Sequence, residues 1–358
     1  MSHSNLDLSE LTATVGRLFM AGMPGPTLDP VTETLIRDHG LGGIILFARN
    51  IEDPVQIATL CLDLQQTALK HHGIPLFIAI DQEGGRVARL QDPFTRFPGN
   101  RAIGEAEDPL KAAAEFADVT AREMALVGLN MNMAPVVDVH KGEPEKHLTG
   151  RTFSEDPTVV AHLGQQVIRT LQQNGIMAVA KHFPGLGRAT MDPHHHLPII
   201  DVDETEMETV NLPPFQGAIE AGVSSIMSSH ALYPAMDPDT PATLSRSVID
   251  RILRKRLGFD GLVITDDLEM GAIKQKCGVV NGAVHAFEAG CDILLICENQ
   301  QLVLESMDAL KSRLLKGEIP TTRLHEATRR INKAKARYLG SRTKADLEQV
   351  KAYFHNRG

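Results

Sequence analysis

The sequence contains no tryptophan, and only 12 phenylalanine and 3 tyrosine residues among its 358 residues. With so few aromatic rings, the protein has few side chains that could stack on nucleic-acid bases or on several units of a long sugar chain. The formal net charge of −9 also argues against non-specific binding to nucleic acid. We therefore expect a partner that is neither a nucleic acid nor a long polysaccharide.

Long hydrophobic runs are also absent. Apolar runs such as 75–80 and 293–297 are far shorter than the ~20 residues that a membrane-spanning helix needs. The first residues carry Asp7 and Glu10, and no basic patch followed by an apolar stretch, so they do not resemble a signal peptide. The four cysteines show no paired metal-ligand spacing and lie among aliphatic residues, as reduced thiols of the cytosol do. These features predict a cytoplasmic protein without a membrane partner.

Eight short aliphatic runs alternate with segments of helical periodicity, and 42% of all residues are hydrophobic. This alternation favours an α/β fold of the (β/α)8 TIM-barrel type over a doubly wound sheet. No Gly/Ser/Pro-rich linker or repeat divides the chain, so residues 1–358 are predicted to form one domain. The predicted strands are 16–20, 43–47, 76–81, 130–136, 178–183, 224–230, 262–267 and 292–298, the first being irregular. The clearest helices are 55–69, 109–126, 159–174 and 246–256.

Charge is unevenly distributed along the chain. Residues 301–358 carry 13 Lys and Arg against 6 Asp and Glu, whereas the remainder has a net charge of −16. Within this basic segment, apolar residues recur at helical spacing, namely Leu324, Ala327, Ile331, Ala334 and Tyr338. The pattern predicts an amphipathic helix that packs on the barrel with its basic face in solvent, rather than a nucleic-acid-binding arm.

Polar residues follow or end several predicted strands. They are Asp81, Lys181, His182, Ser229, His230, Asp266 and Asp267. A single polar residue at such a place is typically a helix cap or a loop residue. In a barrel, however, the carboxyl ends of all strands meet at one face, where active sites are built. Four sets of polar residues at strand ends therefore favour a catalytic pocket.

Four segments carry a resemblance to a known family. They are Asp81-Gln-Glu-Gly-Gly-Arg-Val87, Lys181-His-Phe-Pro-Gly185, Asp192-Pro-His194 with Leu197-Pro198, and Ile264-Thr-Asp-Asp-Leu268. In order and spacing they resemble the motifs of family 3 glycoside hydrolases over about residues 15–340, and more narrowly those of bacterial single-domain β-N-acetylglucosaminidases. The resemblance implies a barrel fold, retaining hydrolysis of a terminal β-N-acetylglucosamine, no metal or other cofactor, and fragments of peptidoglycan turnover as substrates.

Retaining hydrolysis requires a carboxylate that attacks the anomeric carbon and a second group that protonates the leaving oxygen and then deprotonates water. The residue pattern leaves Asp266 and Asp267 as alternatives for the nucleophile, because neighbours on a strand point to opposite faces. The resemblance assigns this role to Asp266. For Asp267 we expect a structural role in capping the next helix.

The resemblance assigns the acid/base role to His194, paired with Asp192. An imidazole suits proton transfer near neutral pH, and an aspartate can orient the ring and stabilise its protonated form. Two departures from the family pattern lie in this loop. Leu186-Gly187 stands where the family has His-Gly, and Pro193 stands where it has Ser. Because Pro193 stiffens the chain, we expect the loop dynamics and the rate to differ from the family, but not the mechanism.

The resemblance also implies which residues grip the terminal sugar. These substrate-binding residues are Asp81, Arg89, Arg151, Lys181 and His182, with His230 lining the pocket. Charged side chains suit this task because they form paired hydrogen bonds with neighbouring hydroxyls. For Lys181 and His182 an internal salt bridge at the barrel mouth is the alternative. For Asp138 we expect a structural role in a loop.

The same residues also allow other functional hypotheses. Asp192, His194 and His196 alternate as D-x-H-x-H, which would suit a metal-dependent hydrolase or deacetylase, although no further ligand motif is present. Amino-sugar binding without catalysis would leave Asp266 unexplained. Within the enzyme hypothesis, the alternatives are a β-glucosidase and a β-glycoside phosphorylase, because a neutral His would not repel phosphate.

Overall fold

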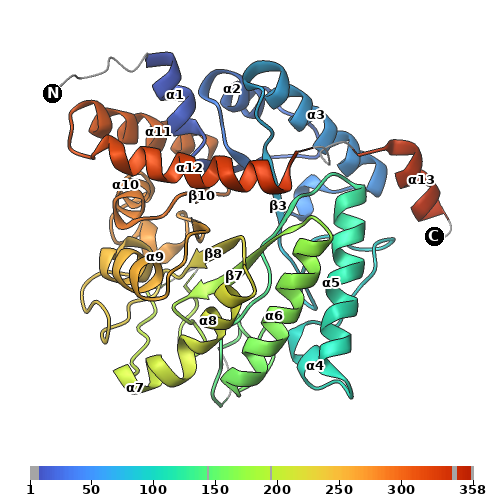
Figure 1. Cartoon of the computed structure of the whole chain (residues 1–358). Helices are drawn as coiled ribbons and strands as arrows, with labels where there is room; N and C mark the ends of the chain where they lie inside the picture. The colour runs from blue at the N-terminus through green and yellow to red at the C-terminus, as the bar shows by residue number, and fades with distance from the viewer. Residues whose placement is uncertain (1–7, 143–144, 194–195, 341–344, 356–358) are drawn as a thin grey trace.

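The computed structural model describes residues 8–142, 145–193, 196–340 and 345–355. Eight parallel strands form a barrel that is nearly closed (Figure 1). Their spatial order is β10-β1-β2-β3-β6-β7-β8-β9, and a parallel bridge between Ile264 and Ile293 joins β9 to β10. The strands are β1 (Phe19–Gly22), β2 (Gly43–Leu46), β3 (Phe77–Ile80), β6 (Met131–Asn132), β7 (Met177–Phe183), β8 (Ser225–Ser228), β9 (Leu262–Thr265) and β10 (Leu294–Ile296). The predicted barrel is thereby confirmed.

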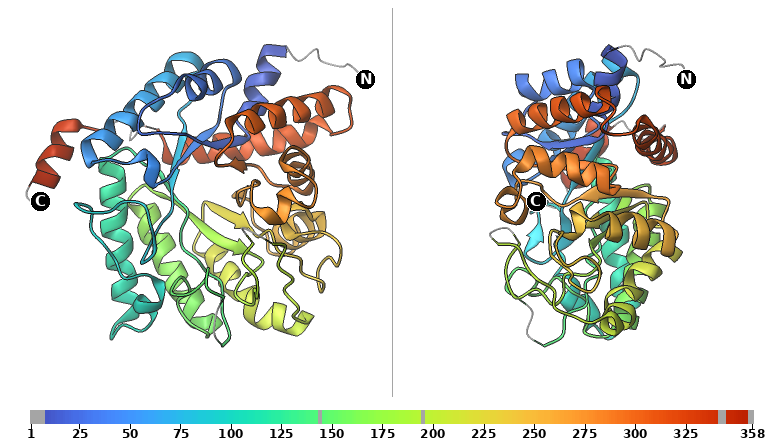
Figure 2. Two further views of the ribbon diagram at one scale, coloured as in Figure 1. Left: turned by 180° about the vertical axis from the view of Figure 1, so that it is seen from behind. Right: turned by 90° about the vertical axis from the view of Figure 1, so that its left-hand side faces the viewer.

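Helices surround the strands in an outer layer, as the two views of Figure 2 show. They are α1 (Leu8–Gly16), α2 (Pro30–His39), α3 (Pro54–His72), α4 (Asn100–Gly104), α5 (Pro109–Leu126), α6 (Pro157–Gln173), α7 (Glu204–Glu206), α8 (Pro213–Glu220), α9 (Gly271–Lys274), α10 (Val279–Ala289), α11 (Gln300–Leu315), α12 (Thr321–Tyr338) and α13 (Leu347–His355). The segments Met207–Asn211 and Ser247–Arg256 are π-helical, and Ala48–Asn50 and Ala242–Leu244 form 3₁₀ turns. None of the described helices is long and apolar enough to cross a membrane.

Four of the outer helices begin with the same dipeptide, Asp-Pro. In α2, α3, α5 and α6 the aspartate side chain accepts a backbone N–H of the first turn, and the proline occupies the first helical position. This arrangement stabilises a helix start, because proline lacks the N–H that would otherwise be unpaired and its φ angle is already helical. The local sequence thus fixes where each of these helices leaves its preceding loop.

The barrel strands are buried on both faces, which explains their continuous aliphatic sequences. The first strand differs from the prediction, because β1 begins at Phe19 and the preceding Val15 and Gly16 end α1. β1 is also regular, since it pairs in parallel with both β2 and β10. A short antiparallel hairpin of β4 (Gln82–Gly84) and β5 (Val87–Ala88) follows β3 at the mouth of the barrel.

The C-terminal helix α12 packs on the barrel as predicted, with Leu324, Ala327 and Ile331 buried. The expectation of a wholly solvated basic face is wrong. The Arg323 side chain is only 13% exposed and pairs with the buried Asp292, and the Lys335 ammonium donates to the carbonyl oxygens of Gly42 and Pro75. The basic charges of this helix therefore help to attach it to the base of the barrel.

Candidate active site

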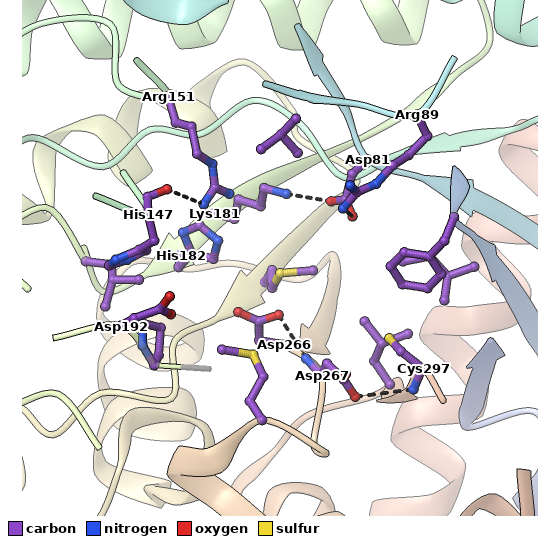
Figure 3. A pocket seen from close by; sticks show the side chains of 18 of the residues that line it. Asp81, Arg89, His147, Arg151, Lys181, His182, Asp192, Asp266, Asp267 and Cys297 are labelled. Atoms are coloured by element: carbon purple, nitrogen blue, oxygen red, sulfur yellow. Dashed lines mark hydrogen bonds and ion pairs between the residues drawn. The ribbon is translucent and has the colours of Figure 1, made fainter. Parts of the chain in front are cut away.

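A cavity of about 520 Å³ opens at the carboxyl ends of the barrel strands (Figure 3). The predicted site residues that line it are Asp81, Arg89, Arg151, Lys181, His182, Asp192 and Asp266. They come from the segments after β3, β5 and β9, from β7, and from the loops that precede α6 and α7. The structure therefore brings together residues that lie up to 185 positions apart in the sequence.

A buried charge network forms one wall of this cavity. The Lys181 ammonium lies 2.9 Å from Asp81 Oδ1 and 2.7 Å from Glu83 Oε1. Arg151 donates from Nε and Nη2 to the two oxygens of Glu83, each at 2.8 Å. The internal salt bridge that was the alternative for Lys181 is thus present, and Lys181 lines the cavity as well.

The network keeps its members charged despite their burial. Burial alone would raise the pKa of Glu83, but Arg151 and Lys181 hold that pKa well below its ordinary value. Burial would lower the pKa of Lys181, yet Asp81 and Glu83 raise it. The wall therefore presents two fixed cations and the Asp81 carboxylate, with the buried Glu83 behind them, which suits a polar, multiply hydroxylated ligand.

Arg89 extends this wall toward the hairpin. Its Nη2 lies 3.2 Å from Asp81 Oδ2, and its guanidinium lies over the Phe47 ring, 5.5 Å from the ring centroid. The buried Nε of Arg89 has no hydrogen-bond partner among the described residues. Asp81 and Phe47 thus fix the orientation of Arg89 on the cavity wall.

His182 is held by Asp138. The ring Nδ1 lies 2.7 Å from Asp138 Oδ2, and the backbone N–H groups of His182 and Leu186 donate to Oδ1 at 3.2 and 2.7 Å. Asp138 is fully buried and braces the loop after β7, in keeping with the structural role expected for it. Because Nδ1 faces a carboxylate, the other ring nitrogen of His182 is left for the cavity.

Asp266 follows β9 directly, and its side chain faces the cavity (Figure 3). One carboxylate oxygen accepts the backbone N–H of Asp267 at 2.8 Å. Burial would raise the pKa of Asp266, but His182, His230 and this N–H hold it below its ordinary value. Asp266 is therefore an ionised carboxylate inside the pocket, as a nucleophile must be.

Asp267 lies in a different environment. Its Oδ1 accepts the backbone N–H groups of Glu269 and Cys297, at 3.1 and 3.2 Å. Burial raises the pKa of Asp267 to about 7, with the neighbouring Glu269 and Asp266 charges acting in the same direction. The residue thus has a structural role, but it ties the turn after β9 to the end of β10 and does not cap the next helix, because Met270 is at the N-cap of α9.

Contrary to what the family resemblance implied, His230 does not line the cavity. It is 1% exposed, is not part of the cavity wall, and lies behind Asp266. Its Nδ1 contacts Thr243 Oγ1 at 2.8 Å and its Nε2 contacts the Asp267 carbonyl oxygen at 2.9 Å. Both ring nitrogens are therefore occupied, because the register of β8 directs this side chain into the protein rather than into the cavity.

The predicted acid/base loop is only partly described. Asp192 and Pro193 line the cavity, whereas His194 lies outside the described residues. Leu186 forms an apolar part of the wall, and a Cβ at Gly187 would lie 1.9 Å from the Val139 carbonyl oxygen. Only glycine fits at that position, so the loop can pass close to the barrel there.

The sequence did not predict Glu83, which lies behind Arg151 and Lys181, or His147, which lines the cavity. Glu83 lies within the first of the four family-like segments, but nothing in the local pattern indicates that it pairs with Arg151. His147 lies four residues before Arg151 in a loop without recognisable periodicity.

Among the described residues, no group of three or more His, Cys, Asp or Glu side chains is arranged to hold a metal ion.

Comparisons with known proteins agree with this geometry. Residues 10–334 match the family model described as "Glycosyl hydrolase family 3 N terminal domain". The chain is 37% identical over 297 residues to a protein named beta-hexosaminidase from Nitrosomonas eutropha, covering 82% of this chain and 84% of that one.

The chain is also similar to solved structures of family 3 glycoside hydrolases. One is a glycoside hydrolase family 3 beta-N-acetylglucosaminidase from Paenibacillus sp. str. FPU-7, with a TM-score of 0.90 and 36% identity, covering 98% of this chain and 68% of that one. Another is NagZ from Neisseria gonorrhoeae in complex with N-trifluoroacetyl-D-glucosamine, with a TM-score of 0.75 and 30% identity, covering 90% and 96%. The barrel fold thus recurs in these proteins.

Proposed function

Because this chain belongs to glycosyl hydrolase family 3, we propose that it is a retaining, exo-acting β-N-acetylglucosaminidase. The names of its relatives support the choice of sugar, since they include a beta-hexosaminidase and a beta-N-acetylglucosaminidase. The observation that carries the proposal is Asp266, an ionised carboxylate that faces a cavity also lined by Asp81, Arg89, Arg151 and Lys181.

The proposed reaction has two steps. Asp266 attacks the anomeric carbon and forms a glycosyl-enzyme, while the His194 imidazolium protonates the departing oxygen. His194 then removes a proton from the water that releases the sugar, and Asp192 stabilises the imidazolium in both steps. The position of Asp192 on the cavity wall supports this role for the loop.

Asp81, Arg89, Arg151, Lys181 and His182 would bind the hydroxyl groups of the terminal sugar. Their fixed geometry supports an exo mode, because a polar wall of this kind suits one sugar. Among the described residues that line the cavity, Phe47 is the only Phe or Tyr on which a further sugar could stack. For the natural substrate we propose cytoplasmic fragments of peptidoglycan turnover that end in β-N-acetylglucosamine. Release of free N-acetylglucosamine from purified disaccharide fragments would test this part.

The decisive experiment compares aryl N-acetyl-β-glucosaminide with aryl β-glucoside for wild type, Asp266→Asn, Asp267→Asn and His194→Ala. We expect wild type to prefer the glucosaminide, and Asp266→Asn to lower kcat by on the order of 10³-fold or more, far beyond the effect of Asp267→Asn. NMR of the first sugar released should show the β anomer. Preference for the glucoside, or an Asp266→Asn variant with wild-type turnover, would contradict the proposal. Added inorganic phosphate should change neither rate nor product.

A further inference from the structure

His147 lies on the loop between β6 and α6, and its ring faces the cavity beside Asp192 and His182 (Figure 3). The side chain is only 6% exposed. Its backbone carbonyl oxygen accepts a hydrogen bond from Arg151 Nη1 at 3.1 Å, so His147 is tied through Arg151 to the charge network of the pocket. His147 is therefore a fixed part of the pocket and not a mobile surface residue.

Glu145 fixes the orientation of the His147 ring. One oxygen of this carboxylate accepts the backbone N–H of His147 at 2.6 Å and also lies in close contact with the ring Nδ1. A carboxylate beside Nδ1 favours the tautomer in which Nδ1 carries the proton. In the neutral ring, Nε2 then carries a lone pair and is a hydrogen-bond acceptor.

The Nε2 atom is buried, and no described residue lies within hydrogen-bonding distance of it. An unpaired buried polar atom costs about 1–3 kcal/mol, so such an atom in a pocket wall is best explained by a partner that arrives with the ligand. Burial lowers the pKa of His147, with His182 acting in the same direction and Glu145 and Asp192 opposing, which favours the neutral ring.

The rest of the pocket explains why a neutral acceptor is useful there. Arg89, Arg151 and Lys181 supply donors, whereas the Asp81 and Glu83 oxygens already accept from these cations. A sugar also has O–H and N–H groups that need acceptors, and His147 Nε2 would add a neutral acceptor to the carboxylate oxygens of the pocket.

We propose that His147 is a substrate-binding residue whose Nε2 accepts a hydrogen bond from a hydroxyl or the acetamido N–H of the bound amino sugar, and that Glu145 positions it. This inference rests on the proposed function in one respect, namely that a sugar occupies the cavity. It assigns a role to a residue outside the four motifs, in the loop between β6 and α6.

The test uses His147→Leu, which keeps most of the volume but has no acceptor, and Thr149→Ala as a control in the same turn, outside the cavity. For His147→Leu we expect KM to rise about 5- to 100-fold with kcat within about threefold of wild type, because the contact is made equally in the ground and transition states. If KM rises only with aryl N-acetyl-β-glucosaminide, the group that binds to His147 is the acetamido N–H. If KM rises with aryl β-glucoside as well, that group is a ring hydroxyl.

Glu145→Gln tests the positioning role. In ¹⁵N NMR, wild-type His147 should show an unprotonated Nε2 whose resonance shifts on titration with N-acetylglucosamine, and Glu145→Gln should alter the tautomer as well as raise KM. An unchanged KM in His147→Leu, or equal losses of kcat and thermal stability without a KM effect, would overturn the inference. If wild type binds N-acetylglucosamine but turns nothing over, the proposed function fails while the NMR titration still decides the role of His147.

Discussion

Glu83 shows how one buried side chain can serve both folding and the pocket. Its carboxylate is 2% exposed and pairs with Arg151 and Lys181. A buried carboxylate is tolerated only because these two cations and their hydrogen bonds offset its loss of hydration. The same contacts orient the Arg151 and Lys181 side chains toward the cavity. Glu83 is therefore a positioning residue for the proposed sugar site.

Glu83→Gln should therefore lower the free energy of unfolding. Removing one charge from a buried network leaves the other charges unpaired, and the expected loss is about 3–5 kcal/mol in the free energy of unfolding. Urea titration measures this loss, and a higher KM should accompany it in the folded variant. The matched control is Glu105→Gln, which breaks the exposed pair with Arg101 and should cost less than about 1 kcal/mol. Equal losses in the two variants would contradict the argument.

Asp267 predicts a pH dependence of stability. Its pKa is raised to about 7 in the folded protein from an ordinary value of 3.8. The folded state thus binds this proton more tightly than the unfolded state, so the stabilisation is complete below about pH 4 and is lost as the pH rises toward 7. A shift of about three pKa units corresponds to at most about 4 kcal/mol.

Asp267→Asn should remove this dependence, because the amide stays neutral and its oxygen can still accept the N–H groups of Glu269 and Cys297. The free energy of unfolding of the variant minus that of wild type should therefore be larger at pH 8 than at pH 5. Chemical denaturation at several pH values measures the difference. Parallel stability curves for the two proteins between pH 4 and 8 would show that Asp267 does not titrate in this range.

The residues that the sequence could not predict have a common physical reason. Asp81, Lys181 and Asp266 were identified because each stands at the end of an aliphatic run, where the barrel rule applies. Glu83 meets Arg151 across 68 residues, and Glu145 holds His147 in a loop without periodicity. Such pairings depend on how loops fold over the barrel mouth, which no local pattern specifies. His230 was misplaced because a polar residue at a strand end can point either way.

At the scale of elements, the aliphatic runs predicted most strands well because strands buried on both faces have continuous apolar sequences. β2 and β9 begin at the predicted residues 43 and 262. β1 begins three residues late because Gly16 ends α1 and a turn at Arg17 and Leu18 follows it. Segment 246–256 was predicted as a helix, but its π-helical hydrogen bonding at Ser247–Arg256 has no signal in residue type.

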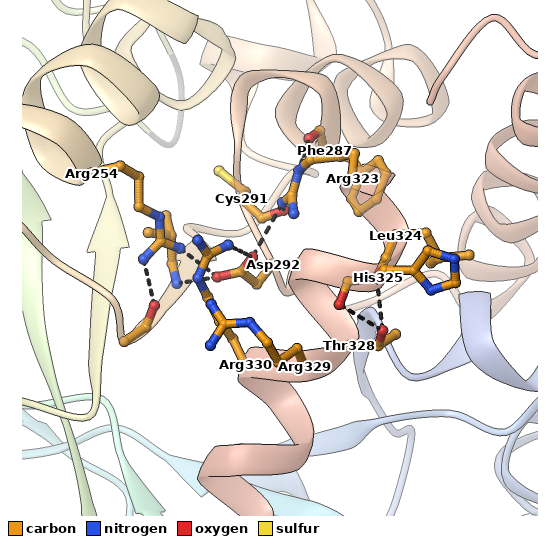
Figure 4. Close-up of polar contacts among 12 residues, drawn as sticks. Arg254, Phe287, Cys291, Asp292, Arg323, Leu324, His325, Thr328, Arg329 and Arg330 are labelled. Atoms are coloured by element: carbon orange, nitrogen blue, oxygen red, sulfur yellow. Dashed lines mark hydrogen bonds and ion pairs between the residues drawn. The ribbon is translucent and has the colours of Figure 1, made fainter. Parts of the chain in front are cut away.

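The attachment of α12 depends on Asp292, which lies at the base of the barrel before β10 (Figure 4). This fully buried carboxylate pairs with Arg254 at 2.5 Å, Arg323 at 3.2 Å and Arg330 at 3.3 Å. The cluster joins the segment before β9 to α12 and lies at the end of the strands opposite to Asp266. It should therefore support stability without taking part in catalysis.

Asp292→Asn leaves three guanidinium groups without their shared counter-charge, and we expect a loss of about 3–5 kcal/mol in the free energy of unfolding. Asp260→Asn is the control, because Asp260 is 50% exposed and its pairs with α12 should contribute about 1 kcal/mol or less. Turnover per folded molecule, measured at low temperature, should stay near wild type in both variants. A specific loss of turnover in folded Asp292→Asn would mean that the base of the barrel controls the pocket.

At the scale of the whole molecule, the two ends of the barrel have separate tasks. The carboxyl ends carry the pocket and its charge network, whereas the amino ends carry the Asp292 cluster and the buried Lys335. The acidic body and the basic C-terminal segment meet at this base. The uneven charge of the sequence thus helps to attach α12 to the barrel, and does not require a nucleic-acid partner.

Helix α13 gives the last prediction, because it lies on the outside of α3 and lines no part of the pocket (Figure 1). Val350 and Phe354 are buried there, and the Phe354 ring lies 4.7 Å from that of Phe94. Removing residues 341–358 should cost at most about 3–6 kcal/mol, since burying each of these side chains contributes about 1.5–3 kcal/mol. Thermal unfolding measures this, and the double variant Val350→Ala, Phe354→Ala should reproduce most of it. Turnover at low temperature should persist in both; a folded but inactive truncation would show that α13 supports the pocket through α3.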